Sequence, residues 1–247
     1  MKPKSEQEIK DMRESGRMTA AVLKLLAKST IPGITTEELD AMAVQELDRL
    51  GGEPAFLGYQ GFPKVVCISI NDQIVHGIPG SYVLQRGDVV GLDFGVRFHG
   101  MITDSAITVS VGDSDKSTQR LIKATEESMY AGIDKVKDGA HTGDIGAAVQ
   151  AVLDREGLGI VRDLAGHGVG HSLHEDPWVP NFGIPGRGMM LQAGMTIAIE
   201  PMATLGTHQV ILEDDGWTVS TADQSVAAHF EHTVLVTDDG NEVLTAW

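Results

Sequence analysis

The chain repeats a pattern of landmarks, and this repetition restricts its fold more than any other feature. Residues 84–87 (Leu-Gln-Arg-Gly) lead through an apolar run to Asp93. Residues 191–194 (Leu-Gln-Ala-Gly) lead in the same frame to Glu200. A repeat with one spacing indicates two similar structural units within one chain.

Two further pairs of residues recur in the same order. His76 stands three residues before a proline, as does His174. Asp104 precedes a β-branched run, as does Glu231. Because these residues occupy matching places in two similar halves, we expect them to meet in a site that both halves share.

The order of predicted elements agrees with a duplication. Apolar residues recur at helical spacing between 9 and 26, and Thr35 with Glu38 forms a capping-box signature for a second helix, which Gly51 and Gly52 close. β-branched runs then predict strands at 65–70, 89–92 and 107–111. The second half repeats this order, with a helix over 121–136, a helix capped by Thr142, and strands that resume at Thr196 and Thr233.

These elements predict one α/β (α+β) domain over residues 1–247. Its two similar halves meet at a central cleft, because no Pro-rich, Ser-rich or charged linker separates them. The Gly-rich and Pro-rich residues 181–188 are expected to form a surface loop.

Composition excludes several classes of function. A formal net charge of -16 argues against nucleic-acid binding, which needs Lys and Arg to neutralise phosphates. No apolar run approaches the roughly 18 residues of a spanning helix, and the polar start gives no export signal, so neither a membrane nor export is expected. Cys67 is the single cysteine, which suits a reducing compartment such as the cytoplasm and leaves metal binding to His and carboxylates.

Two carboxylates follow apolar strands and are expected to be buried. Asp93 follows residues 89–92, and Glu200 follows residues 197–199. A salt bridge or a backbone cap would explain any one buried carboxylate. However, Arg86 and Arg97 are the only strong cations near Asp93, and the run around Glu200 has none. Several convergent anions would repel one another, so bound cations are the better explanation.

The candidate ligand set is larger than one tetrahedral zinc accepts. Four carboxylates and one imidazole suit two divalent ions, of Mn, Fe, Co or Zn; they are Asp93, Asp104, His167, Glu200 and Glu231.

His167 lies in a glycine-rich segment, residues 166–171, where the backbone can approach a ligand closely. A phosphate-binding loop is the competing interpretation, but the segment lacks the Lys and Ser/Thr of such loops. Among the neighbouring histidines, His171 is the candidate for a structural role. The others are expected at the surface or in polar networks; they are His99, His141, His208 and His229.

Together, the motifs of this chain resemble those of the type I methionine aminopeptidases, which have the pita-bread fold. The resemblance covers nearly the whole length and is closest to the short bacterial form. It rests on residues 67–71, 76–79, 166–170 and 174–175, on the Asp93 and Asp104 pair, on Glu200-Pro201 and on residues 231–233. The pita-bread fold implies two pseudo-symmetric halves around a central antiparallel sheet.

The resemblance implies a division of labour among the ligands. Asp93 and Asp104 would chelate one metal ion, and His167 and Glu200 would complete the other. Asp104 and Glu231 would bridge both ions. A water between the ions would attack the first peptide carbonyl, with Glu200 as general base.

Two histidines and an apolar pocket complete the implied site. His174 would contact the scissile carbonyl, and His76 the amide nitrogen and the following residue. The implied methionine pocket consists of Phe56, Tyr59, Phe62, Cys67, Leu173 and Trp217. Packing in the core is the competing role for the aromatic residues. The chain departs from the family at Gln60, Phe62 and Leu173, where His, Tyr and Phe are common.

The implied activity is removal of the initiator methionine from nascent proteins whose second residue is small. The expected partners are therefore N-terminal peptides of nascent chains, with the ribosome left open and a monomer expected. A proline-specific dipeptidase would use the same ligands, but such enzymes usually carry a sizeable amino-terminal domain. A catalytically silent binding protein is the non-enzyme alternative, although such proteins tend to lose ligands that this chain keeps.

Overall fold

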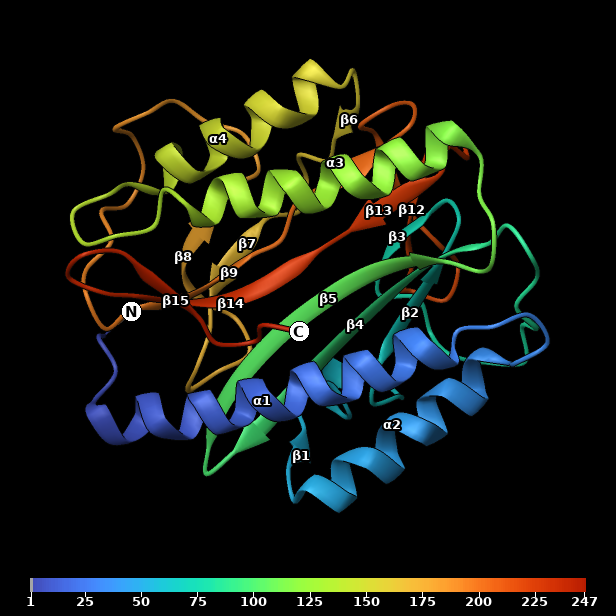
Figure 1. The fold of residues 1–247 in the computed structure, drawn as a ribbon, viewed down its shortest axis with the longest axis horizontal. Helices are drawn as coiled ribbons and strands as arrows, with labels where there is room; N and C mark the ends of the chain where they lie inside the picture. Colours follow the sequence, from blue (N-terminus) through green and yellow to red (C-terminus); the bar gives the residue numbers. More distant parts are fainter. Residues whose placement is uncertain (1) are drawn as a thin grey trace.

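A computed structural model describes residues 2–247 and shows two helix pairs, each followed by strands. The first pair is α1 (Glu6–Ser29) and α2 (Thr36–Leu50), and the second is α3 (Lys116–Ile133) and α4 (Thr142–Arg155). Figure 1 shows one pair beside β4 and β5 and the other beside β9 and β14, with the long strands between them. The predicted order of elements is therefore confirmed in both halves.

The helix boundaries follow from local capping. Thr35 accepts a hydrogen bond from the Glu38 N–H and receives the reciprocal side-chain contact, and Gly51 ends α2 with a left-handed φ of 81°. The expected cap at Thr142 is wrong, because Thr142 is already helical and His141 takes the N-cap position. The His141 N–H donates to the Asp144 side chain at 2.7 Å, so the acidic residue at the third position of α4 caps the start of the helix.

A nine-stranded sheet joins the halves, and its pairings are antiparallel. Its main path runs β1-β4-β5-β14-β9-β7-β8, with β2 added on β4 and β15 on β14. The bounds are β1 (Glu53–Pro54), β2 (Cys67–Ile70), β4 (Val89–Phe98), β5 (Met101–Ser110), β7 (Gly166–Gly168), β8 (Glu175–Val179), β9 (Thr196–Ile199), β14 (Glu231–Val236) and β15 (Asn241–Val243). The order is symmetric about the contact between β5 and β14, where the halves meet.

The remaining strands form two small sheets. One has the order β13-β10-β6 and the other β11-β12-β3. Their bounds are β3 (Gln73–Val75), β6 (Gly159–Ile160), β10 (Met202–Thr204), β11 (Val210–Leu212), β12 (Val219–Thr221) and β13 (Ala227–His229), and a short 3-10 helix, η1, covers Tyr59–Gly61.

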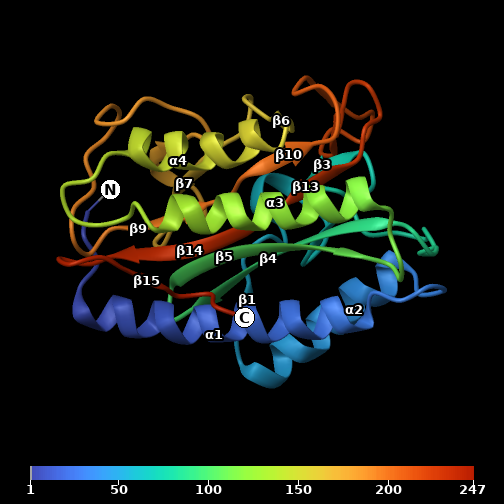
Figure 2. The ribbon, with the colours of Figure 1, turned by 45° about the horizontal axis from the view of Figure 1, so that its top comes forward.

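Alternation along the strands separates an apolar face from a polar one. Leu92 and Phe94 of β4 pack in one core with α1 and α2. Ile197 and Ile199 of β9 pack in another with α3 and α4. Side chains of successive strand residues point to opposite faces, so Asp93 points away from the helices. The helices thus cover one face of the sheet (Figure 2), and alternation places the strand carboxylates on the other face.

Some boundaries differ from the sequence-based expectation. The strand expected at 65–70 begins only at Cys67, and β4 and β5 are longer than the β-branched runs that predicted them. Asp104 consequently lies inside β5 rather than before it. The expected surface loop 181–188 is largely exposed, but Asn181 is buried and its amide donates to the Glu200 carbonyl at 3.0 Å. Within residues 2–247, no helix is long and apolar enough to cross a membrane.

Candidate active site

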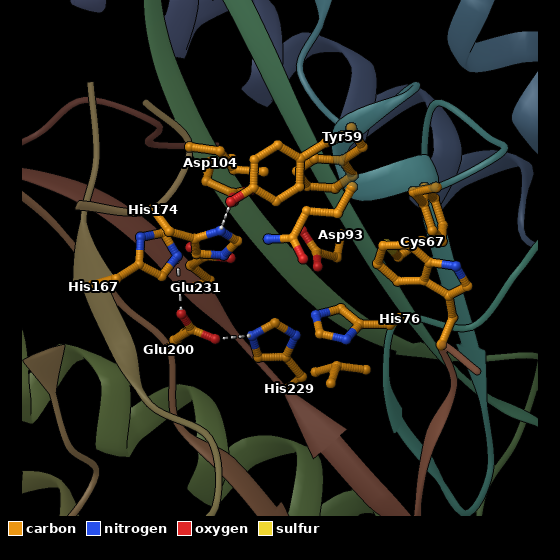
Figure 3. A pocket seen from close by; sticks show the side chains of 16 residues that line it. Tyr59, Cys67, His76, Asp93, Asp104, His167, His174, Glu200, His229 and Glu231 are labelled. Atoms are coloured by element: carbon orange, nitrogen blue, oxygen red, sulfur yellow. Dashed lines mark hydrogen bonds and ion pairs between the residues drawn. The ribbon is translucent and has the colours of Figure 1, made fainter. Parts of the chain in front are cut away.

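A cavity of about 160 Å³ opens on the helix-free face of the sheet. Its lining includes every residue that the sequence assigned to metal binding, to catalysis and to the methionine pocket. Figure 3 shows the histidines and carboxylates converging on this space. The structure therefore brings together residues that are up to 175 positions apart, from Phe56 to Glu231.

Strand register places three of the carboxylates. Ala106 of β5 pairs with Asp93 of β4 on one side and with Glu231 of β14 on the other. Directly paired residues point to the same face, so Asp93 and Glu231 flank β5. Asp104 lies two residues from Ala106 on β5 and therefore shares that face. The two halves supply one row of acidic side chains across their junction.

His167 and Glu200 complete the cluster from the second half. His167 Nε2 lies 3.3 Å from Glu200 Oε1. In the tautomer in which His167 Nδ1–H donates to the Gly168 carbonyl at 2.9 Å, Nε2 is free to act as a ligand. Ligand atoms of Asp104, His167 and Glu231 lie within 4.8 Å of one another.

The electrostatics of the cluster favour bound cations. Burial raises the pKa of the Asp104 carboxyl to about 7, and burial with neighbouring carboxylates raises the pKa of Asp93, Glu200 and Glu231. Asp93 Oδ1 and Glu231 Oε1 are buried without a hydrogen-bond partner. Among the described residues that line the cavity, none is Lys or Arg. A donor set of carboxylates and one neutral imidazole fits divalent metal ions, which would supply the missing charge.

His174 and His76 face the cluster from matching positions in the two halves. Tyr59 Oη lies 2.8 Å from His174 Nδ1, and the His174 ring is 4.3 Å from the His167 ring. Burial, with a smaller contribution from His174, lowers the pKa of His76 to about 4. Burial also lowers the pKa of His174. Both imidazoles are therefore neutral near pH 7.

The chain before α1 supports the loop that carries His174. Lys4 Nζ, whose side chain is fully buried, contacts Glu175 Oε2 at 3.1 Å, and the Lys4 N–H donates to the Gly194 carbonyl at 2.7 Å. Glu175 also accepts from the Ser172 N–H at 2.9 Å. Gly170 leaves room for the lysine, because a Cβ there would lie 2.3 Å from Lys4 Cε. This segment links the N-terminal region to the active-site loop.

The apolar wall of the cavity is a separate cluster. It contains all six residues expected in the methionine pocket, together with Ala55, Ile102, Val169 and Ile78. Phe62 and Trp217 meet edge to face with ring centroids 5.1 Å apart. Phe56 and Phe62 are 6% and 3% exposed, so they pack in this cluster and also line the cavity.

Comparisons with known proteins agree with this geometry. Residues 10–238 match the model of metallopeptidase family M24. The chain belongs to metallopeptidase family M24. It is 46% identical over 242 residues to a methionine aminopeptidase of Clostridium perfringens, covering 98% of this chain and 97% of that protein. A crystal structure of methionine aminopeptidase from Thermotoga maritima superposes with a TM-score of 0.98 at 39% identity, covering 100% of both chains.

This M24 chain also shares its fold with more distant enzymes. The prolidase of Pyrococcus horikoshii superposes with a TM-score of 0.81 at 22% identity, and the match covers 99% of this chain but 63% of that enzyme. The expected pita-bread fold is confirmed, and the more similar relatives also confirm the recognition of the chain as a type I methionine aminopeptidase.

Sequence reasoning missed one residue of this M24 site. His229 was expected at the surface or in a polar network, but it is 3% exposed, lines the cavity, and its Nε2 lies 3.6 Å from Glu200 Oε2. The available signal was its position two residues before Glu231, because residues two apart in an extended chain lie on the same face. His171, the expected structural histidine, contacts Glu8 at 2.7 Å and does not line the cavity.

Proposed function

We propose that the chain removes the N-terminal methionine of nascent proteins when the second residue is small. The observation that carries this proposal is the convergence of five expected metal ligands beside an apolar pocket in one cavity. We also propose that the enzyme acts as a monomer in the cytoplasm, where nascent chains are available.

The assignment of ligands follows the row of side chains across the sheet. Asp93 and Asp104 would hold one divalent ion, His167 and Glu200 the other, and Asp104 and Glu231 both. Such ions act as Lewis acids, which make water easier to deprotonate and balance negative charge on a carbonyl oxygen.

Glu200 is the proposed general base. Its carboxylate lies between His167 and His229, at 3.3 and 3.6 Å. Burial raises its pKa well above the usual value, so it can accept a proton at neutral pH and pass it on. In the sequence of steps, Glu200 takes the proton of the attacking water and delivers it to the leaving amine.

His174 and His76 orient the peptide bond. If Tyr59 O–H donates to His174 Nδ1, then His174 Nε2–H is available as a donor to the scissile carbonyl oxygen. His76 lies at the cavity wall beside Trp217, with ring centroids 6.5 Å apart. There it contacts the amide of the scissile bond, and it limits the space for the second side chain.

The apolar wall selects the first residue. Aromatic rings and the Cys67 sulfur match the polarisable thioether of methionine, whereas a charged side chain would lose its hydration without gaining a partner. One methylene more or less changes selectivity by only about 1 to 3 kcal/mol, so norleucine should be tolerated.

A peptide panel tests the proposal. We expect metal-reconstituted enzyme to cleave Met-Ala, Met-Gly, Met-Ser, Met-Thr, Met-Pro and Met-Val peptides, and to leave Met-Leu, Met-Lys and Met-Glu nearly intact. If Leu-Ala or Ala-Ala were cleaved with a kcat/KM equal to that of Met-Ala, the methionine assignment would be wrong. Preferential cleavage of Ala-Pro would indicate a dipeptidase instead.

A further inference from the structure

A second cavity, of about 350 Å³, adjoins the proposed active site. The two cavities share a wall that consists of Val75, His76, His167, His174 and Glu200. The methionine-pocket residues line only the first cavity, and Leu164, Asp176, Trp178 and Met202 line only the second. The shared histidines therefore separate an apolar pocket on one side from an open groove on the other.

Trp178 is the most exposed large side chain of this second cavity. It lies on β8, the last strand of the main sheet path, and is 59% exposed. Exposure alone would mean little, because single apolar residues are common on protein surfaces. However, Trp178 pairs directly with His167 across β7 and β8. Directly paired residues share a face of the sheet, with Cβ atoms roughly 5 Å apart, so Trp178 flanks a proposed metal ligand.

We propose that Trp178 binds the substrate beyond the scissile bond and selects for an apolar third residue. This inference rests on the proposed function and extends it to a subsite. The occupant is the peptide chain itself, because the groove is continuous with the cavity in which the first peptide bond would be cleaved.

The dimensions agree with this occupant. With methionine in the apolar pocket, the scissile bond lies over the shared wall, and an extended chain advances roughly 3.4 Å per residue. The third residue then lies about 7 Å from the first, on the side of the second cavity. An indole one strand beyond His167 is within reach of that residue.

The chemistry of the groove sets the preference. Met202 and Val75 are buried in its floor, and Trp178 offers a flat apolar surface at its edge. Asp176, on the same strand, is exposed and carries a carboxylate group. An apolar or aromatic third side chain would cover part of the indole, whereas an acidic one would meet a like charge.

The test compares peptides that differ in length and in the third residue. We would measure kcat/KM of the metal-loaded enzyme for Met-Ala, Met-Ala-Phe-Ala and Met-Ala-Asp-Ala. The expected order is Phe peptide, then dipeptide, then Asp peptide. In Trp178→Ala, the ratio of kcat/KM for Met-Ala-Phe-Ala to that for Met-Ala should fall by about tenfold, because the buried contact with the ring is lost.

Two further variants make the outcome decisive. Ile184→Ala, which removes another exposed apolar residue (67% against 59% for Trp178) that lines neither cavity, should keep the wild-type ratio. Trp178→Phe should keep most of it, and Trp178→Gln, which removes the apolar ring but keeps a long side chain, replaces Trp178→Ala as the test if the latter does not fold. An unchanged ratio in Trp178→Ala, or in the Trp178→Gln variant that replaces it, with Met-Ala still cleaved, would overturn this inference alone. Absence of cleavage of every Met peptide would overturn the proposed function and, with it, the subsite.

Discussion

The two halves of the molecule hold matching carboxylates in different ways. Asp93 lies inside β4, which pairs with β5 over ten consecutive residues. Its counterpart Glu200 follows β9, which is four residues long, and Pro201 separates β9 from β10. β10 then belongs to a different sheet. A proline has no N–H to donate, so the ladder ends where the first half continues it.

The same sequence pattern therefore serves two different roles in the two halves. The long hairpin of the first half fixes Asp93 and Asp104 as a rigid platform for ions. The break in the second half frees Glu200 from the ladder: Asn181 holds its backbone carbonyl, and its carboxylate has two imidazoles beside it. A ligand that is also a general base has to reorient its carboxylate, whereas a ligand that only binds does not.

The largest effect should come from removing the platform. Asp104→Asn removes a charge that both ions would share, so we expect loss of bound metal and a fall in kcat of about 10³-fold or more. Chelation of the wild-type enzyme should abolish activity, and Mn, Co or Fe should restore it. Glu200→Gln should lower kcat as strongly but retain more metal.

Elemental analysis beside steady-state kinetics measures both quantities. Equal metal content in the two variants would contradict the division between platform and base. Full activity without any bound metal would contradict the metal-dependent function itself.

The next effect concerns the paired histidines. His174→Ala should lower kcat by roughly 10²-fold, as loss of a group that stabilises an oxyanion does, with fold and metal content nearly unchanged. His76→Ala should cost less, about tenfold, because it contacts the leaving side of the bond. Circular dichroism and metal analysis serve as controls, and unchanged turnover in His174→Ala would assign that residue to structure.

Much of this arrangement could be predicted from the sequence because the duplication left visible traces. Helix caps such as Thr35 with Glu38 are local, and apolar runs mark strands directly. Asp93, Asp104 and Glu231 were recognisable because each stands beside such a run. Their convergence followed from symmetry, since equivalent places in two halves meet at the junction of β5 and β14.

Other parts of the site could not be predicted because they depend on long-range contacts. His229 becomes part of the site only when β13 is placed beside Glu200, and the sequence marks it only by its spacing of two residues from Glu231. Lys4 contacts Glu175, which is 171 positions away. Asp104 was expected before its strand because the strand was placed from its β-branched residues alone. Pairing with β4 on one side and β14 on the other makes the strand longer than that run.

Substitution of Lys4 should have a smaller effect, and this effect distinguishes the loop of His174 from the loop of His76. The loop of His76 is held locally, by the Gly77 N–H donating to Ser69 Oγ at 3.1 Å, whereas the loop of His174 needs Lys4. Lys4→Met should lower the free energy of unfolding by about 2 kcal/mol, because it leaves Glu175 largely buried and unpaired. Urea unfolding measures this change.

Matched variants test whether loss of the ion pair between Lys4 and Glu175 causes the change in stability. Lys4→Arg should restore most of the stability, and adding Glu175→Gln to Lys4→Met should recover part of it. If Lys4→Met were as stable as the wild type, the ion pair would not support the loop of His174.

The pH dependence of stability provides a finer comparison. The pKa of His76 is about 4 when folded and near 6.5 when unfolded, so the unfolded chain binds a proton first as the pH falls. The contribution of His76 is fully present above pH 6.5 and is lost between pH 6.5 and 4, at up to ~1.4 kcal/mol per pH unit. Relative to wild type, His76→Gln should therefore gain stability over that window. Parallel stability curves for the two proteins between pH 6.5 and 4 would contradict the buried, neutral state of His76.

The smallest effect is expected at His229, which links the two halves through its backbone. Thr108 of β5 accepts from the His229 N–H at 2.9 Å and donates to the His229 carbonyl at 2.6 Å, so the first half holds this residue of the second. Burial lowers the pKa of His229 to about 3, and its neutral ring lies 3.6 Å from Glu200. The ring is too far from Glu200 for a hydrogen bond, so it steadies the carboxylate as a neutral polar neighbour, and loss of that contact should cost about 1 kcal/mol or less.

We therefore expect His229→Leu to lower kcat by about fivefold with little change in KM. His229→Gln, which keeps a neutral N–H donor of similar reach, should stay within about twofold of wild type. Steady-state kinetics on Met-Ala-Phe-Ala would measure both variants. Because Glu200 is the carboxylate that the strand break leaves outside the ladder, equal losses in the Leu and Gln variants would mean that the shape rather than the polarity of the side chain at position 229 steadies it.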